Sequence, residues 1–106
     1  MSNSVHPVVI IDTSLRDLIP QFLRNKRAAV VGAVAAIDLD EFDRASEVGH
    51  QLKGEGGTYG FSVLTDMGRD FEEAASSGNR AKALEWARQI LDYLDTVEVR
   101  FSEDAD

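Results

Sequence analysis

The sequence predicts an all-α protein, an antiparallel up-down-up-down four-helix bundle with a short N-terminal arm or helix. Three observations indicate this fold. Apolar residues recur at helical spacing in four stretches between about positions 20 and 101. Short connections rich in Asp, Gly, Ser and Asn separate these stretches, and such connections make neighbouring helices run antiparallel. The length of 106 residues suits one small domain with a single core.

Residues 1–12 form the predicted arm. The four apolar residues at 8–11 have the composition of a strand, but the sequence offers no second strand to pair with them. We therefore expect an extended segment, or one that packs across the bundle. The Asp, Thr and Ser at 12–14 are good N-cap residues, so a helical turn or two should follow. The bundle is predicted to span 13–101, and 102–106 is an acidic tail.

The first long helix is predicted from Pro20 to Ile37, because proline fits the first turn of a helix and not its interior. A turn follows, in which Asp40 is the expected N-cap of the next helix. That second helix should run from about Glu41 to Gly57 and place His50 about 130° from the centre of its apolar stripe, facing outward. The stripe consists of Phe42, Ala45, Val48, Gly49, Leu52 and Gly56.

The third helix is predicted to begin near Phe61 and to stop at the Ser-Ser-Gly-Asn stretch of 76–79, which is a strong stop signal. The last helix is expected from about Arg80 to Phe101, where apolar residues keep a helical spacing. Glu72 and Glu73 on the third helix are expected to face solvent. No internal repeat or domain boundary is visible.

Composition excludes several classes of function. There is no cysteine, so disulfides and thiolate metal sites are ruled out. Nineteen acidic and eleven basic residues give a formal charge of −8, which makes nucleic acid an improbable partner. No apolar run is long enough to span a bilayer, and the start lacks the features of a signal peptide, so a cytoplasmic protein with no membrane contact is expected.

The candidate site lies around His50, where the chain carries more glycine than a helix tolerates well. Four glycines at 49, 54, 56 and 57 would weaken the helix by roughly 2 to 4 kcal/mol relative to alanine. Ser46, Lys53, Gly54 and Gly57 fall on the same helical face as His50. Gly49 and Gly56 are better explained by close packing between helices. This pattern indicates a histidine that another protein can reach.

A neutral imidazole is a competent nucleophile for group transfer, and Lys53 lies one helical turn from it. An ammonium at that place can stabilise the negative oxygens of a phosphoryl group through charge-assisted hydrogen bonds. Gly54 and Gly57 leave room for the active site of a second protein, and Gln51 can add a polar contact. His50 and Lys53 are thus the candidate catalytic residues, with Ser46, Gln51, Gly54 and Gly57 as candidate partner-binding residues.

The stretch His50-x-Leu52-Lys53-Gly54, followed by Gly57 and Gly60 and the amphipathic run that starts at Phe61, resembles the histidine-containing phosphotransfer domain of bacterial phosphorelays. The resemblance covers roughly 13–101. It implies that His50 receives a phosphoryl group from a receiver-domain aspartate and passes it to another receiver. It also implies no ATP site and no kinase activity of its own, with receiver domains and possibly a hybrid sensor kinase as partners.

Other interpretations remain beside this one. The same face could bind a signalling partner without His50 ever being modified.

A nucleotide-binding loop at the glycines is excluded, because no strand precedes the glycines and no Gly-Lys-Ser or Gly-Lys-Thr follows them. No metal site or cofactor is expected, because the acids at 38–43 lack calcium-loop spacing. Arg24, Lys26 and Arg27 form a basic patch that could dock a partner or be plain solvated surface. A helical bundle with one exposed reactive face is most simply a monomer, so we expect a monomer.

Overall fold

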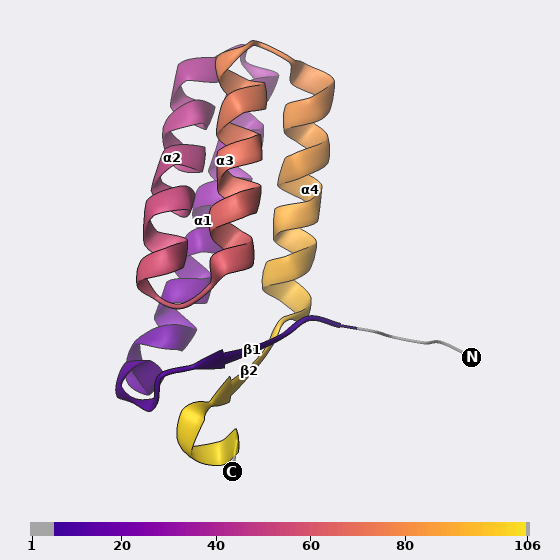
Figure 1. The fold of residues 1–106 in the computed structure, drawn as a ribbon. Helices are drawn as coiled ribbons and strands as arrows, with labels where there is room; N and C mark the ends of the chain where they lie inside the picture. Colours follow the sequence, from indigo (N-terminus) through magenta and orange to yellow (C-terminus); the bar gives the residue numbers. More distant parts are fainter. Residues whose placement is uncertain (1–5, 106) are drawn as a thin grey trace, which may run out of the picture.

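The computed structural model describes residues 6–105 and contains the four expected helices. They are α1 (Ile19–Asp38), α2 (Phe42–Thr58), α3 (Ser62–Ser76) and α4 (Arg80–Thr96). Figure 1 shows them side by side, with successive helices pointing in opposite directions. The prediction of a four-helix bundle is confirmed.

The start of α1 follows the expected pattern. A 3₁₀ segment, η1 (Thr13–Leu18), precedes it, and the carboxylate of Asp12 caps this segment by accepting from the backbone N–H of Ser14 at 2.8 Å. Pro20 is the second residue of α1, where its missing N–H costs no hydrogen bond. Local capping chemistry therefore fixes where the first long helix begins.

The expectation that Asp40 caps α2 is wrong. Asp40 has a φ of 62°, and the residue that precedes α2 is Glu41, which makes no side-chain cap. The Asp40 carboxylate instead pairs with Arg80 at the start of α4, and Arg80 also donates to the carbonyl of Ile37 at 2.6 Å. Asp40 thus ties the α1–α2 turn to α4, a contact between distant residues that no local signal reveals.

The core lies between the four helices and is closed near one end by aromatic rings. Phe22 of α1 stacks on Tyr59 with ring centroids 4.3 Å apart, and on Phe61 with centroids 5.4 Å apart. Phe61 and Phe71 are fully buried. Burial of such large apolar side chains is the main favourable term in folding. The fully buried aliphatic side chains of the four helices include Val30, Ile37, Leu52, Leu64 and Ile90.

The end of α4 differs from the prediction. The helix stops at Thr96 and not at Phe101, and the chain continues as strand β2 (Glu98–Phe101). This strand pairs in parallel with β1 (Val8–Ile11), in the register Val8 to Glu98. The apolar run at 8–11 has a strand partner after all, because residues 98–101, which were predicted to belong to the last helix, are extended.

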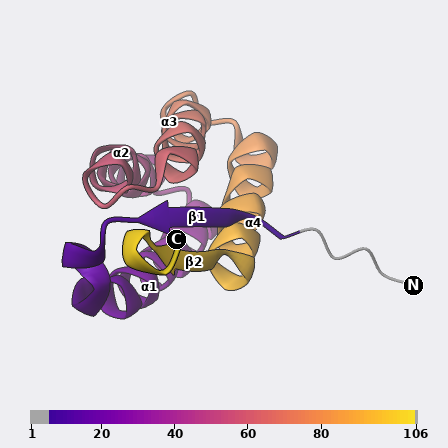
Figure 2. The same ribbon diagram turned by 60° about the horizontal axis from the view of Figure 1, so that its bottom comes forward.

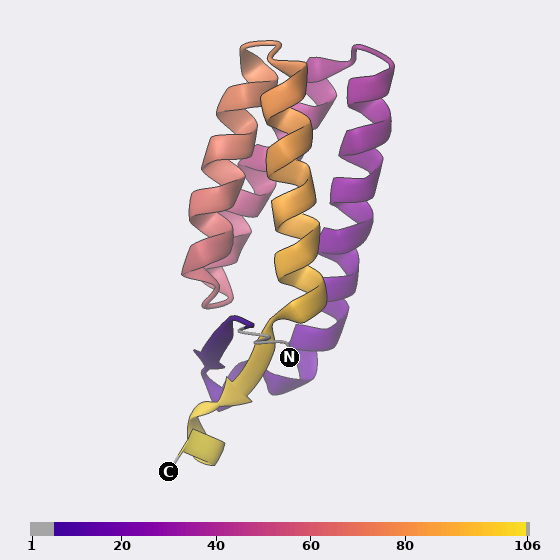
Figure 3. The ribbon, with the colours of Figure 1, turned by 90° about the vertical axis from the view of Figure 1, so that its right-hand side faces the viewer.

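The two strands, here called the clasp, lie across one end of the bundle (Figures 2 and 3). Ile11 is fully buried, and its Cδ1 atom lies 2.8 Å from where a Cβ of Gly60 would be, in the α2–α3 turn. Gly60 has a φ of +92°, a second reason for glycine there. Around the strands, His6 Nε2 lies 2.8 Å from Glu98 Oε1. The clasp therefore supports the turn that joins α2 to α3.

Candidate functional site

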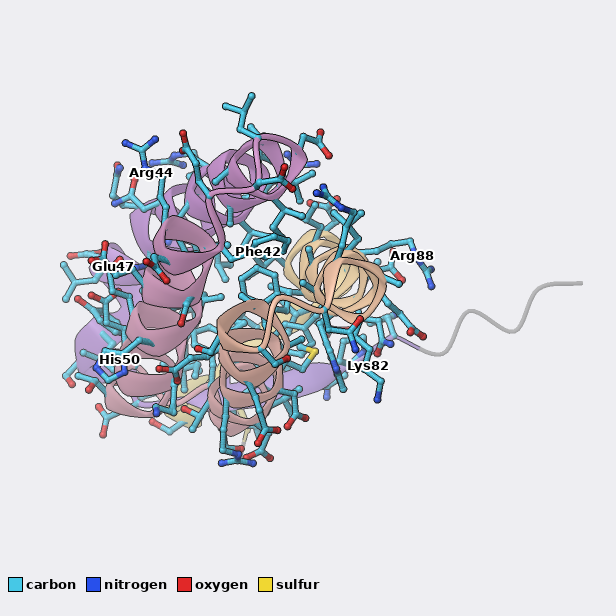
Figure 4. All side chains as sticks on the ribbon, turned by 90° about the horizontal axis from the view of Figure 1, so that it is seen from above. Phe42, Arg44, Glu47, His50, Lys82 and Arg88 are labelled. Carbon is cyan, nitrogen blue, oxygen red and sulfur yellow. The ribbon has the colours of Figure 1, made fainter. Side chains whose placement is uncertain are left out.

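His50 lies in the middle of α2 and faces away from the core, as predicted. Its side chain is 68% exposed, while its neighbours Gly49 and Leu52 are buried against the bundle. Figure 4, a view down the bundle, shows the ring pointing outward from α2. A visiting protein can therefore reach the imidazole.

Glycines bring α2 and α3 into close contact behind this face. A Cβ atom on Gly49 would lie 2.8 Å from the Cα of Glu72, and one on Gly68 would lie 2.8 Å from the backbone nitrogen of Lys53. A Cβ on Gly56 would lie 2.9 Å from the backbone nitrogen of Thr65. The interpretation of Gly49 and Gly56 as packing glycines is confirmed. The contact places the α3 backbone directly beside the candidate site.

Glu72 of α3 is the residue that this contact adds to the site. Its Oε2 atom lies 3.3 Å from His50 Nδ1, and its Oε1 atom lies 3.0 Å from Lys53 Nζ. The side chain is 24% exposed, so the expectation that it simply faces solvent is wrong. Glu72 follows Gly68 by one helical turn and therefore lies on the same face of α3. One carboxylate thus contacts both candidate catalytic residues.

The charge of Glu72 determines which ring nitrogen of His50 is free. The hydrogen bond from Lys53 lowers the pKa of the Glu72 carboxyl below its usual value of 4.5, with smaller contributions from the charges of Lys53 and His50. At neutral pH the group is therefore a carboxylate, which can only accept hydrogen bonds. A hydrogen bond to it requires the proton on Nδ1, so in the neutral ring Nε2 keeps its lone pair. Nε2 is therefore the ring nitrogen that is available to act as a nucleophile.

Lys53 is held from two sides. Its ammonium is paired with Glu72, and its backbone carbonyl accepts a hydrogen bond from Thr65 Oγ1 at 2.9 Å. An ammonium carries three donors, so one contact with Glu72 leaves others for a bound anion. His50 and Lys53 are thus held by contacts with the same carboxylate, that of Glu72.

The other predicted site residues line the same helix. Gly54 is exposed, and a Cβ there would meet nothing within 4 Å. Gly57 is also exposed, and a Cβ added to it would lie 3.4 Å from Thr65 Oγ1, an ordinary contact distance. Gln51 is exposed, whereas the hydroxyl of Ser46 lies 2.8 Å from that of Ser76 on α3. No contact within residues 6–105 explains a glycine at position 54.

The basic patch on α1 is largely neutralised within the molecule. Lys26 pairs with Glu55 of α2, and Arg27 pairs with Asp95 of α4 at 2.7 Å. Arg24 donates to the side-chain oxygen of Gln21 at 3.0 Å. Two of the three cations therefore hold helices together, which weakens the case for the patch as a docking site.

A comparison with known protein families matches most of the chain. The family model described as Hpt domain matches residues 15–100, a span that contains all four helices and the residues of the site. Searches of curated proteins and of solved structures returned no match. Within residues 6–105, no helix is long and apolar enough to cross a membrane.

Proposed function

The chain belongs to the Hpt domain family, whose members act in histidine phosphotransfer, and on this basis we propose that His50 carries the phosphoryl group. The group comes from the aspartyl phosphate of one receiver domain and passes to the aspartate of another, in the cytoplasm. The observation that supports this most is the exposed imidazole whose Nδ1 faces Glu72, leaving Nε2 directed to visitors.

The transfer step needs no further reactant. The lone pair of Nε2 attacks the phosphorus of the aspartyl phosphate, a bond forms between nitrogen and phosphorus, and the bond from phosphorus to the aspartyl oxygen breaks. The receiver leaves with its carboxylate restored. Nδ1 keeps its proton, so the phosphorylated ring gains a positive charge, and the Glu72 carboxylate 3.3 Å away opposes that charge. Reversal of these bond changes delivers the group to a second receiver.

Lys53 and the exposed glycines Gly54 and Gly57 act on the phosphoryl group and on the receiver that brings it. The Lys53 ammonium stabilises the phosphoryl oxygens, because two of its donors remain free when one is bound to Glu72. Gly54 and Gly57 let the receiver's active site approach, and Ser46 and Gln51 contribute polar contacts at its rim. Hpt domains work with receiver domains and kinases in phosphorelays, which makes a hybrid sensor kinase a second class of partner.

The test is incubation with phosphorylated receivers, one at a time, with labelled phosphate. We expect label on this protein that is lost in acid and kept in base, and none on a His50→Gln variant. The chain contains one other histidine, His6, which is the matched control, and a His6→Gln variant should be labelled normally. Gly54→Leu should fold but accept label more slowly. Equal labelling of His50→Gln would reject the proposal, and receiver binding without labelling would favour a plain interaction module.

A further inference from the structure

The outer side of α1 carries an apolar surface that nothing in the described structure covers. Two large side chains stand out on it, Val31 with 47% and Leu39 with 69% of the residue exposed. At 100° per residue, its members fall within an arc of about 100°, along more than two turns of the helix. We call this surface the α1 face, and it consists of Ala28, Val31, Gly32, Ala35 and Leu39, all exposed.

Gly32 in the middle of the α1 face is not required by the fold. A Cβ at this position would meet nothing within 4 Å, in contrast to the tightly packed Gly49 and Gly68. Glycine inside a helix is less favourable than alanine, because its backbone loses more freedom on folding. Beside Ala28 and Ala35 it leaves a low surface on which another helix can pack closely.

Two opposite charges stand at the ends of the α1 face, each seven positions from Val31. They are Arg24 and Asp38. Among residues 6–105 neither of them has an ion-pair partner, and Arg24 donates only to the neutral side chain of Gln21. Asp38 is the last residue of α1, where the helix dipole disfavours an acid. At 100° per residue, Arg24, Val31 and Asp38 all lie on the same side of the midline of the α1 face. The arrangement is therefore symmetric about Val31 in position and opposite in charge.

We propose that the α1 face binds the α1 face of a second copy of this chain, with the two helices antiparallel. A two-fold axis at Val31 brings Arg24 of each copy beside Asp38 of the other, because an antiparallel two-fold pairing joins residues on the same side of the two stripes. The two ion pairs lie about 21 Å apart, at 1.5 Å per residue. A parallel two-fold pairing would instead place Arg24 at the level of Arg24 and Asp38 at the level of Asp38, so the opposite charges would not meet. Each copy then supplies one cation and one anion to the antiparallel contact, so the α1 face is complementary to itself in charge.

This arrangement leaves α2 and His50 outside the contact between the copies. Figure 3 shows α1 along one edge of the bundle, and Figure 4 shows His50 pointing outward from the neighbouring helix. Helices α2 and α4 are the long helices that flank α1. A contact made by one helix is small, so we expect a weak dimer with a dissociation constant of roughly 10 to 100 µM. A monomer was expected because the sequence indicates one reactive face, around His50, and the α1 face was not part of that prediction.

Sedimentation equilibrium of the full chain, from about 1 µM to about 1 mM, tests the proposal. The average mass should rise toward twice that of the monomer across this range. Arg24→Glu and Asp38→Arg should each weaken association about five- to thirty-fold, since each places like charges together twice. The double variant R24E/D38R exchanges the charges and should restore the dimer.

A Val31→Lys variant should be monomeric at all concentrations, because it places two ammonium groups at the axis. Circular dichroism of every variant should match the wild type, since all three positions are exposed. A wild-type protein that stays monomeric to 1 mM would overturn the proposal, as would a double variant that associates no better than the single ones. Labelling of His50 by a receiver is a separate measurement, so failure here and failure of the proposed phosphotransfer are distinguishable.

Discussion

Glu72 reaches His50 because residue 49, one position before the histidine, is a glycine. The Cα of Glu72 lies 2.8 Å from where a Cβ of residue 49 would be, so any side chain there would push α3 away from α2. The carboxylate that contacts both His50 and Lys53 would move with the helix. Helix packing and the chemistry of the site are thus set by the same backbone contact.

Gly49→Ala should therefore destabilise the fold and slow phosphotransfer together. Overpacking of a tight contact usually costs about 1 to 3 kcal/mol, more than the helix gains from alanine. Urea unfolding gives the stability, and the rate of labelling by a receiver gives the transfer. Gly54→Ala is the matched control, because its Cβ meets nothing, and it should leave the fold unchanged or up to about 1 kcal/mol more stable. Equal stability of the two variants would contradict the role of Gly49.

Glu72→Gln should remove a pH-dependent part of the stability. The pKa of Glu72 is below 4.5 in the folded protein and returns to about 4.3 to 4.5 on unfolding, so the unfolded chain binds more protons in between. The stabilisation is complete above the unfolded pKa and is lost as pH falls through the folded pKa. The stability difference between wild type and variant should be constant above about pH 5.5 and shrink below about pH 4.5. Urea unfolding at a series of pH values measures it, and a difference that is flat down to pH 3 would reject this assignment.

Lys53→Ala should shorten the lifetime of the phosphorylated histidine or slow its formation, roughly tenfold, because a charge-assisted contact to the phosphoryl oxygens is lost. The fold should remain, since Lys53 lies at the edge of the core. Lys82 of α4 is an exposed lysine on another side of the bundle and serves as the control (Figure 4). Decay of acid-labile label over time compares Lys53→Ala with Lys82→Ala. The rate of labelling by a receiver compares their formation, and identical decay together with identical labelling rates would remove Lys53 from the mechanism.

Ile11→Ala should destabilise the protein by about 2 to 4 kcal/mol, because this fully buried side chain fills the space beside Gly60. Its neighbour Ile10 is 59% exposed, and Ile10→Ala should cost less than about 1 kcal/mol. Thermal unfolding of the pair isolates the contribution of the clasp to the core. Similar losses in both variants would mean that strand pairing, and not burial of Ile11, holds this segment.

Local signals were enough to predict the helices and the outward direction of His50. Pro20, the stop at Ser76–Asn79 and the apolar stripe of α2 each act within a few residues, so their effects can be read without knowing the rest of the chain. The predicted role of Gly49 is confirmed for the same reason, since a buried glycine on an apolar stripe indicates close packing.

The errors come from contacts between residues that are distant in sequence. Val97 and Phe101 keep a helical spacing with Leu94, and the same stretch also alternates as a strand, so the pattern alone could not end α4 at Thr96. The strand forms because β1 lies beside it. Glu72 was missed because its role depends on α2, although its position one turn after Gly68 was a usable signal.

Pairing between β1 and β2 joins positions about 90 apart in the chain, which has a consequence for the order of folding. Closing a loop of that size costs about 4 kcal/mol of chain entropy, more than two four-residue strands recover by themselves. The strands can therefore meet only after α1 and α4 have aligned. In the native protein the sheet should open before the helices do, and its backbone amides should exchange with deuterium sooner than those of Leu52 or Phe71.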